Sequence, residues 1–97
     1  MKLITEKRLN KYLDLTSKAL KKVKIAKDIS KKDKERAKTY LNMSKNYLSD
    51  AKHFKKEGNW VNSFAAVNYA HAWLDAGALV GLFDVDKDNV MFTVDID

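Results

Sequence analysis

The sequence predicts an all-α protein, an antiparallel three-helix bundle with an extended, strand-like C-terminal tail. Two observations support this prediction. The 97-residue chain has no Pro and only three Gly, so long helices are not interrupted. Residues 60–83 hold no Lys or Arg and a single acid, Asp75. Because a helix that is apolar on nearly every side belongs inside a protein, we expect this segment at the centre of the bundle.

The first helix is expected over about residues 5–27. Thr5 can cap its N-terminus, and Glu6 places a negative charge in the first turn, where the helix dipole favours it. Leu9 and Leu13 begin an apolar stripe whose spacings alternate between four and three residues. Lys residues dominate the opposite side, so one side should pack and the other should face solvent.

The second helix is expected over residues 30–57. Ser30 and Asp33 resemble a capping box, with Asp in place of the usual Glu or Gln. Gly58 follows a basic last turn and stands where a left-handed residue ends a helix. The side predicted to pack is formed by Ala37, Tyr40, Leu41, Ser44, Tyr47, Leu48, Ala51 and Phe54.

The third helix is expected over residues 59–83, with Asn59 as its cap. Gly77 and Gly81 are four residues apart, which predicts a packing notch that a neighbouring backbone can approach. Short connections between the helices favour antiparallel neighbours. The whole chain, residues 1–97, is therefore expected to form one domain.

The acidic tail, residues 84–97, changes to the alternating pattern of a strand. Val90, Phe92, Val94 and Ile96 alternate with more polar residues or Met. A lone strand has no ladder partner inside a helical bundle. The tail is therefore expected either to lie in a groove of its own bundle or to pair with a second copy.

Charge is unevenly distributed along the chain, whose net charge is +6. Residues 1–57 hold 18 of the 19 basic residues against 7 acids, which gives +11, whereas the last fourteen residues carry −4. Such basic helices could follow a phosphate backbone, but 17 of the 19 basic residues are Lys, so bidentate Arg contacts are scarce. The alternative is a solvated surface. The candidates for contacting nucleic acid are Lys31, Lys32, Lys34, Arg36, Lys38 and Lys45.

Several classes of site lack the residues they need. The chain has no Cys, hence no disulfide or thiolate ligand, and its two His residues, His53 and His71, lie on different predicted helices. No cofactor is expected. The N-terminus lacks the apolar segment of a secretory signal, which predicts a cytoplasmic protein without a membrane partner.

One line of polar residues is the candidate for catalysis. Asn68, His71 and Asp75 share a side of the third helix, and Asp75 could orient the His71 imidazole as a general base. No nucleophile motif accompanies them. The alternative is a polar seam or a hydrogen-bonded structural network, which we favour.

The acidic turn is the candidate for metal binding. Asp84, Asp86 and Asp88 have the spacing that opens a calcium loop, and Asp95 stands at its twelfth and last position. However, Asn89 stands where such a loop needs Gly, and Asp95 replaces the bidentate Glu. We therefore predict an acidic turn in solvent and no metal.

The second half of the chain resembles a small archaeal family that is known as domain of unknown function 357. The resemblance covers roughly residues 35–94 and is most specific at the WLDAG segment, residues 73–77. It implies a compact helical bundle in an archaeal cytoplasm, with no established activity and no catalytic residues. The other matching residues are Tyr47, Asp50, Ala51, Phe54, Gly58, Asn59, Tyr69, Ala70, Gly81, Leu82, Phe83, Phe92, Thr93 and Val94.

The leading prediction is a non-enzymatic helical module for interaction or assembly, whose partner is another protein or a second copy. The first alternative is an accessory domain that binds RNA or DNA through Lys-rich faces of the first two helices. The second is an enzyme centred on His71 and Asp75. The candidate interface residues are Trp60, Trp73, Gly77, Gly81, Phe92 and Val94.

Overall fold

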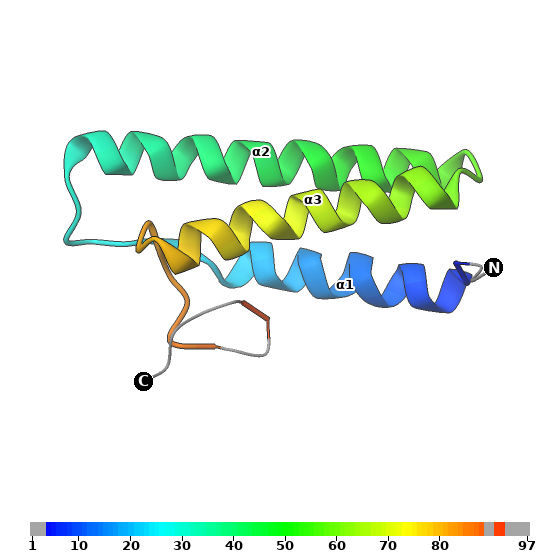
Figure 1. The fold of residues 1–97 in the computed structure, drawn as a ribbon, viewed down its shortest axis with the longest axis horizontal. Coiled ribbons are helices and arrows are strands. Elements are labelled where there is room, and N and C mark those ends of the chain that lie inside the picture. The colour runs from blue at the N-terminus through cyan, green and yellow to red at the C-terminus, as the bar shows by residue number, and fades with distance from the viewer. Residues whose placement is uncertain (1–3, 89–90, 93–97) are drawn as a thin grey trace.

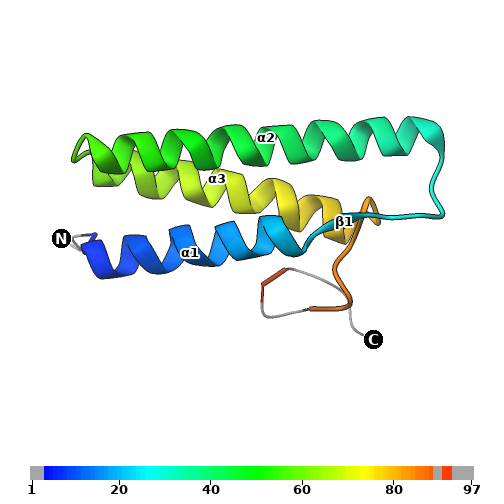
Figure 2. The same ribbon diagram turned by 180° about the vertical axis from the view of Figure 1, so that it is seen from behind.

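The computed structural model describes residues 4–88 and 91–92. These residues form an up-down-up arrangement of three helices, with α3 between α1 and α2 in the view of Figure 1. The view from behind shows the same order (Figure 2). The predicted all-α three-helix bundle is therefore confirmed. The elements are α1 (Glu6–Lys22), β1 (Lys24–Ile25), α2 (Lys31–Lys56), α3 (Trp60–Leu79) and β2 (Phe83–Asp84).

Each helix begins at the cap that the sequence predicts. A short polar side chain accepts a hydrogen bond from a main-chain N–H three residues further on, which gives one of the orphan donors of the first turn a partner. The pairs are Thr5 with Arg8 (3.1 Å), Ser30 with Asp33 (3.0 Å) and Asn59 with Asn62 (3.2 Å).

Two glycines end the second and third helices in the same way. Gly58 and Gly81 have positive φ angles of 80° and 83°, and the residue after each donates its N–H to a helix carbonyl five residues back. This is the Schellman arrangement, which gives the last carbonyls partners. It corrects the predicted end of the third helix from residue 83 to Leu79, because Gly81 turns the chain out of the helix.

The first helix also ends earlier than predicted, at Lys22 instead of residue 27. Val23 is extended, and Lys24 and Ile25 pair antiparallel with Asp84 and Phe83. The N–H of Ala26 continues this contact by donating to the Leu82 carbonyl at 2.9 Å. Hydrogen bonds to a segment about sixty residues away thus replace the last turn that the local pattern favours.

The core consists of two clusters along the bundle. The first is centred on Leu9, Leu13, Leu48 and Val67, and the second on Ala19, Leu74 and Phe83, with the tail residue Phe92. Leu9 and Leu74 are fully buried. All three helices contribute to the first cluster, and the second also takes in β2 and Phe92.

Small residues hold α2 and α3 close together. The Ser44 hydroxyl donates to the Ala70 carbonyl at 2.8 Å, and the Ser63 hydroxyl donates to the Ala51 carbonyl at 2.6 Å. Both serines are fully buried. Ser44 and Ala51 are seven residues apart, as are Ser63 and Ala70, so the two bonds define a single antiparallel register between the helices.

Most of the predicted strand, residues 90–96, lies outside the described residues. Met91 and Phe92, which are described, belong to a turn and a bend and not to a strand. Within the described part of the chain, none of the helices is both long and apolar enough to cross a bilayer.

Candidate functional site

One face of α3 is open to solvent and carries no charged side chain. The prediction that this helix is buried on every side is therefore wrong. Four of its large side chains are mostly exposed: Val61 (69%), Tyr69 (60%), Leu79 (61%) and Val80 (64%). Smaller residues occupy the middle of the same face. We call this surface the α3 outer face; it consists of Val61, Ala65, Asn68, Tyr69, Ala72, Ala76, Leu79 and Val80.

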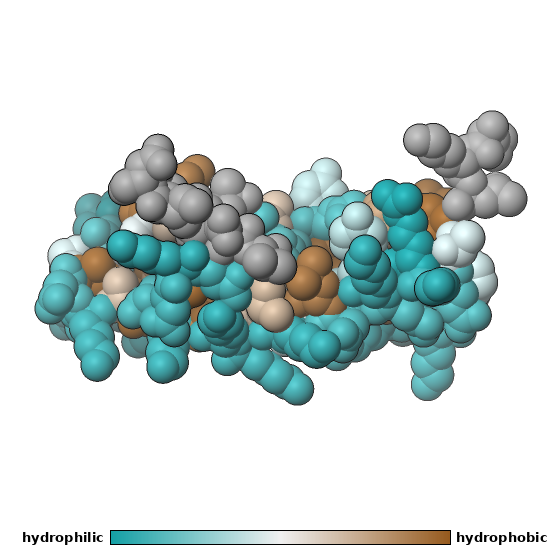
Figure 3. Space-filling view, turned by 90° about the horizontal axis from the view of Figure 1, so that it is seen from below, coloured by the Kyte–Doolittle hydropathy of each residue, from teal (hydrophilic) through white to brown (hydrophobic). Residues whose placement is uncertain are grey.

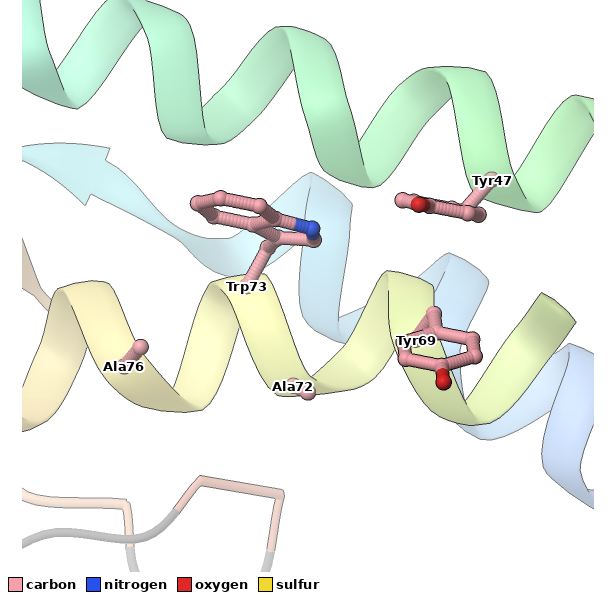
Figure 4. Close-up of a pocket in the computed structure, with 5 residues that line it drawn as sticks. All are labelled: Tyr47, Tyr69, Ala72, Trp73 and Ala76. Atoms are coloured by element: carbon pink, nitrogen blue, oxygen red, sulfur yellow. The ribbon is translucent and has the colours of Figure 1, made fainter. Parts of the chain in front are cut away.

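A shallow groove runs along this face. One hollow of about 350 Å³ is lined by Tyr47 of α2 and by Tyr69, Ala72, Trp73 and Ala76 of α3. A second hollow, of about 390 Å³, is lined by residues 65, 68, 69 and 72. The two hollows share Tyr69 and Ala72, so they adjoin each other along the outer face, and together they are called the groove. Figure 4 shows Tyr47 and Trp73 over the seam between the helices, with the small side chains of Ala72 and Ala76 beside them.

Aromatic contacts fix the walls of this groove. Tyr47 and Tyr69 stack with ring centroids 5.4 Å apart, and Trp73 meets the ring of Tyr40 edge to face at 5.0 Å. Each contact joins α2 to α3, so the rings are held from both sides. Rigid aromatic side chains lose little conformational entropy on binding, which suits this groove for contact with a partner.

The structure brings together only two of the three candidate catalytic residues, His71 and Asp75. His71 is half-buried: its Nδ1 lies 2.9 Å from the Thr16 hydroxyl of α1, and its Nε2 contacts the Met91 carbonyl. Because a carbonyl only accepts, Nε2 carries the hydrogen and Nδ1 of the neutral ring accepts from Thr16. Asp75 Oδ1 lies 3.7 Å from Nε2, whereas Asn68 is exposed on the outer face.

His71 therefore anchors the chain after β2 to the bundle. Its ring stacks on that of Phe92 at 6.3 Å, and Phe92 is buried, with 3% of its surface exposed. Lys22 of α1 adds an ion pair with Asp88 at 2.7 Å. In this conformation Phe92 packs against its own chain, in the second core cluster.

The other candidate interface residues have mixed positions. Gly77 is a packing notch, but its occupant is the chain's own Phe83, since a Cβ at Gly77 would lie 2.1 Å from the Phe83 ring. Gly81 is exposed in the turn after α3. Trp60 and Trp73 are half-buried, and only Trp73 lines the groove. Val94 lies outside the described residues.

The acidic residues after α3 act mainly as structural groups of a turn. Asp84 accepts from the N–H of Asp86, and Asp88 accepts from the N–H of Met91. Asp86 and Lys87 both have positive φ angles, and the N–H of Asp88 closes the turn by donating to Val85 at 3.0 Å. Within residues 4–88 and 91–92, no three possible metal-ligating residues lie close enough to hold an ion, and Asp95 falls outside this range.

The six candidate nucleic-acid contacts are all exposed and all belong to α2. Two of them form ion pairs within the helix, Arg36 with Asp33 at 2.8 Å and Lys38 with Glu35 at 3.8 Å. Hydrophilic side chains also cover much of the surface seen from the α1 side (Figure 3). Five of the six candidates lie within residues 31–38, in the first turns of α2, and Lys45 lies further along the same helix.

Sequence reasoning missed the α3 outer face, although a signal was present. Ala65, Ala72 and Ala76 recur at helical spacing on one side of a helix without Lys or Arg. From the sequence alone, the lack of charge in this segment predicts a helix that is buried on every side. The helices on either flank leave one side of α3 uncovered, which the composition of a single segment does not reveal.

Comparison with known proteins gives one match. The family model described as "Protein of unknown function (DUF357)" matches residues 11–83, about three quarters of the chain. No curated protein matches this sequence. No solved structure matches it either.

Proposed function

This chain belongs to the DUF357 family of proteins of unknown function, and we propose that it is a non-enzymatic interaction module that binds a helical protein partner on the α3 outer face. The observation that carries this proposal is the uncharged, exposed groove along α3, with small residues in the middle and large apolar residues at both ends. Exposed apolar patches of this kind mark interaction sites, and a groove without charges suits an amphipathic helix.

The surroundings of His71 support the non-enzymatic part of the proposal. Both ring nitrogens contact groups of the same chain, Thr16 and the Met91 carbonyl. A general base needs a nitrogen that can reach the proton of a substrate. Here Nδ1 contacts α1 and Nε2 contacts the chain after β2, so we place an enzyme centred on His71 and Asp75 below an interaction module.

A photo-crosslinking experiment tests the proposed function. Benzoylphenylalanine replaces Ala72 in the groove. As a control it replaces Ser49, which is exposed on the side of α2 opposite the buried Ala51. In cells that naturally make the protein, position 72 should crosslink to a defined protein and position 49 should not. Ala65→Glu in the same chain should suppress the crosslink. No crosslink at position 72, or equal crosslinks at both positions, would refute the proposal.

Nucleic-acid binding is the second candidate function. It is favoured by four exposed lysines on α2, Lys31, Lys32, Lys34 and Lys45, alongside Arg36 and Lys38. It ranks second because Arg36 and Lys38 already have acidic neighbours, and because Lys offers a point charge where Arg offers a bidentate contact.

A further inference from the structure

The α3 outer face has the dimensions of a helix-packing surface. Ala65, Ala72 and Ala76 follow one line along the exposed side of α3, and Tyr69 lies beside that line. Small residues let a second helix approach to the short end of the usual interaxial range of about 8–10 Å. A second helix that sets its own side chains against this line of small residues therefore fits this face.

The face is complementary to itself when turned end for end. If two copies of α3 pack antiparallel, Tyr69 of one copy meets Ala72 of the other, and Ala65 meets Ala76. Val61 then meets Leu79. The midpoints of the first two pairs fall between Ala70 and His71, and that of Val61 and Leu79 falls at Ala70, so one register brings all three pairs to within one residue of alignment. A self-complementary patch of this kind is what a two-fold symmetric interface requires.

Charges at the edge of the groove fit the same register. Arg36 and Asp50 lie seven residues on either side of Met43, on the side of α2 that carries Tyr47. The α2–α3 register places Arg36 level with Ala78 and Asp50 level with Phe64. Antiparallel pairing of α3 therefore brings Arg36 of one copy to within one residue of the height of Asp50 of the other, so opposite charges lie at similar heights along the interface. Arg36 also pairs with Asp33 of its own helix at 2.8 Å and would exchange or share that partner in the dimer.

We propose that the partner bound on the α3 outer face is a second copy of this chain, in an antiparallel α3–α3 dimer whose two-fold axis passes near Ala70 and His71. This inference rests on the proposed function and identifies the protein that the interaction module binds. The outer face itself contributes no charge, so two copies with a net charge of +6 each can meet there while most of their lysines point into solvent.

Cysteine crosslinking tests the register, because the chain contains no cysteine of its own. Under mild oxidation Ala72→Cys should form a covalent dimer, since two residues at position 72 are offset by only about 4–5 Å along the helix. A mixture of Ala65→Cys and Ala76→Cys should also crosslink. Ala65→Cys alone should not, because its offset of about 16 Å exceeds the 4–7 Å between Cα atoms that a disulfide spans. Ser49→Cys is the matched control and should remain uncrosslinked.

The mass in solution tests the interface without a covalent bond. In sedimentation experiments the unmodified chain should be a dimer at micromolar concentration. Ala72→Glu should raise the dissociation constant by more than about tenfold, because it buries two like charges near the axis, while Ser49→Glu should leave it unchanged. Arg36→Glu should weaken the dimer, and Arg36→Glu combined with Asp50→Arg should restore it.

The outcomes separate this inference from the proposed function. A monomer whose position 72 photo-crosslinks to a different protein would overturn the dimer and leave the interaction module standing. A dimer in which Ala65→Cys alone crosslinks efficiently would show parallel packing and would also overturn it. A chain that crosslinks to nothing through position 72 would overturn both.

Discussion

The hydroxyl of Ser44 on α2 donates a hydrogen bond to the carbonyl oxygen of Ala70 on α3 at 2.8 Å, inside the seam between the two helices. A side chain this small lets the helix backbones come close, and its hydroxyl finds a partner where water does not reach. This contact, together with the one between Ser63 and Ala51, sets the register that positions Tyr47 beside Tyr69 in the groove.

Ser44→Ala is expected to lower the free energy of unfolding by about 1 kcal/mol, because it removes one buried hydrogen bond. Ser44→Val should cost about 1–3 kcal/mol, since its extra methyl groups force the helices apart. Denaturant unfolding at a fixed protein concentration measures both, with Ser49→Ala as the exposed control. A Ser44→Val variant as stable as the parent chain would show that the seam is not tightly packed.

Gly77→Ala should also cost about 1–3 kcal/mol, because the new methyl group would overlap the Phe83 ring. Phe83→Leu in the same chain makes room at this position. The double variant should therefore lose less stability than the two single changes added together. Simple additivity in denaturant unfolding would mean that Gly77 and Phe83 are not in contact.

His71→Ala and Thr16→Val are expected to be coupled, since the ring nitrogen and the hydroxyl lie 2.9 Å apart. A double-mutant cycle of unfolding free energies should give a coupling of about 0.5–3 kcal/mol. The same pair tests whether His71 is structural. Loss of a measurable activity in His71→Ala with unchanged stability would favour the enzyme alternative instead.

Phe92→Ala should lower stability by about 3 kcal/mol, because it empties a buried position of the second core cluster. The mass of the assembly in solution should not change, since Phe92 packs within its own chain. A fall in mass on this substitution would show that the tail crosses to a partner, as the strand pattern of the sequence also allowed.

Labelled RNA and DNA oligomers should bind only at low salt, with affinity that falls steeply as salt rises. The reason is that the basic residues at the start of α2 are mostly Lys, which offers no bidentate phosphate contact, and Arg36 among them already pairs with Asp33. Fluorescence anisotropy across a salt series measures this. Binding that survives physiological salt, and is lost when Lys31, Lys32 and Lys34 are changed to Glu, would favour the nucleic-acid function.

The helices and their starts were predictable because they depend on neighbours in the chain. Thr5, Ser30 and Asn59 each act within three residues of their own position, and Gly58 ends α2 by its own conformational freedom. The same rule applied to Gly81 would have placed the end of α3 correctly. The four-residue spacing of Gly77 and Gly81 instead predicts one packing notch. In the structure Gly77 makes room for Phe83, and Gly81 ends the helix.

The candidate site was less predictable than the fold. The sequence predicts Trp73 as an interface residue, and Trp73 lines the groove. It predicts Ala65, Ala72 and Ala76 as buried, whereas Ala65 and Ala72 are exposed and Ala76 is partly exposed. Alanine is common both in protein cores and on exposed helix-packing surfaces, so its identity does not tell a buried position from an exposed one. The positions of α1 and α2 around α3 determine which of these alanines are exposed.

Three amphipathic or apolar helices, their caps and their up-down-up order follow from local features of the chain, because periodicity, capping and short connections each involve neighbouring residues. Where α1 stops, which segment fills the space above Gly77 and which side of α3 faces solvent depend instead on how the bundle folds. Each of these depends on hydrogen bonds or contacts between residues far apart in the chain, such as Ala26 with Leu82 and His71 with Met91. Those contacts arise only when the bundle closes.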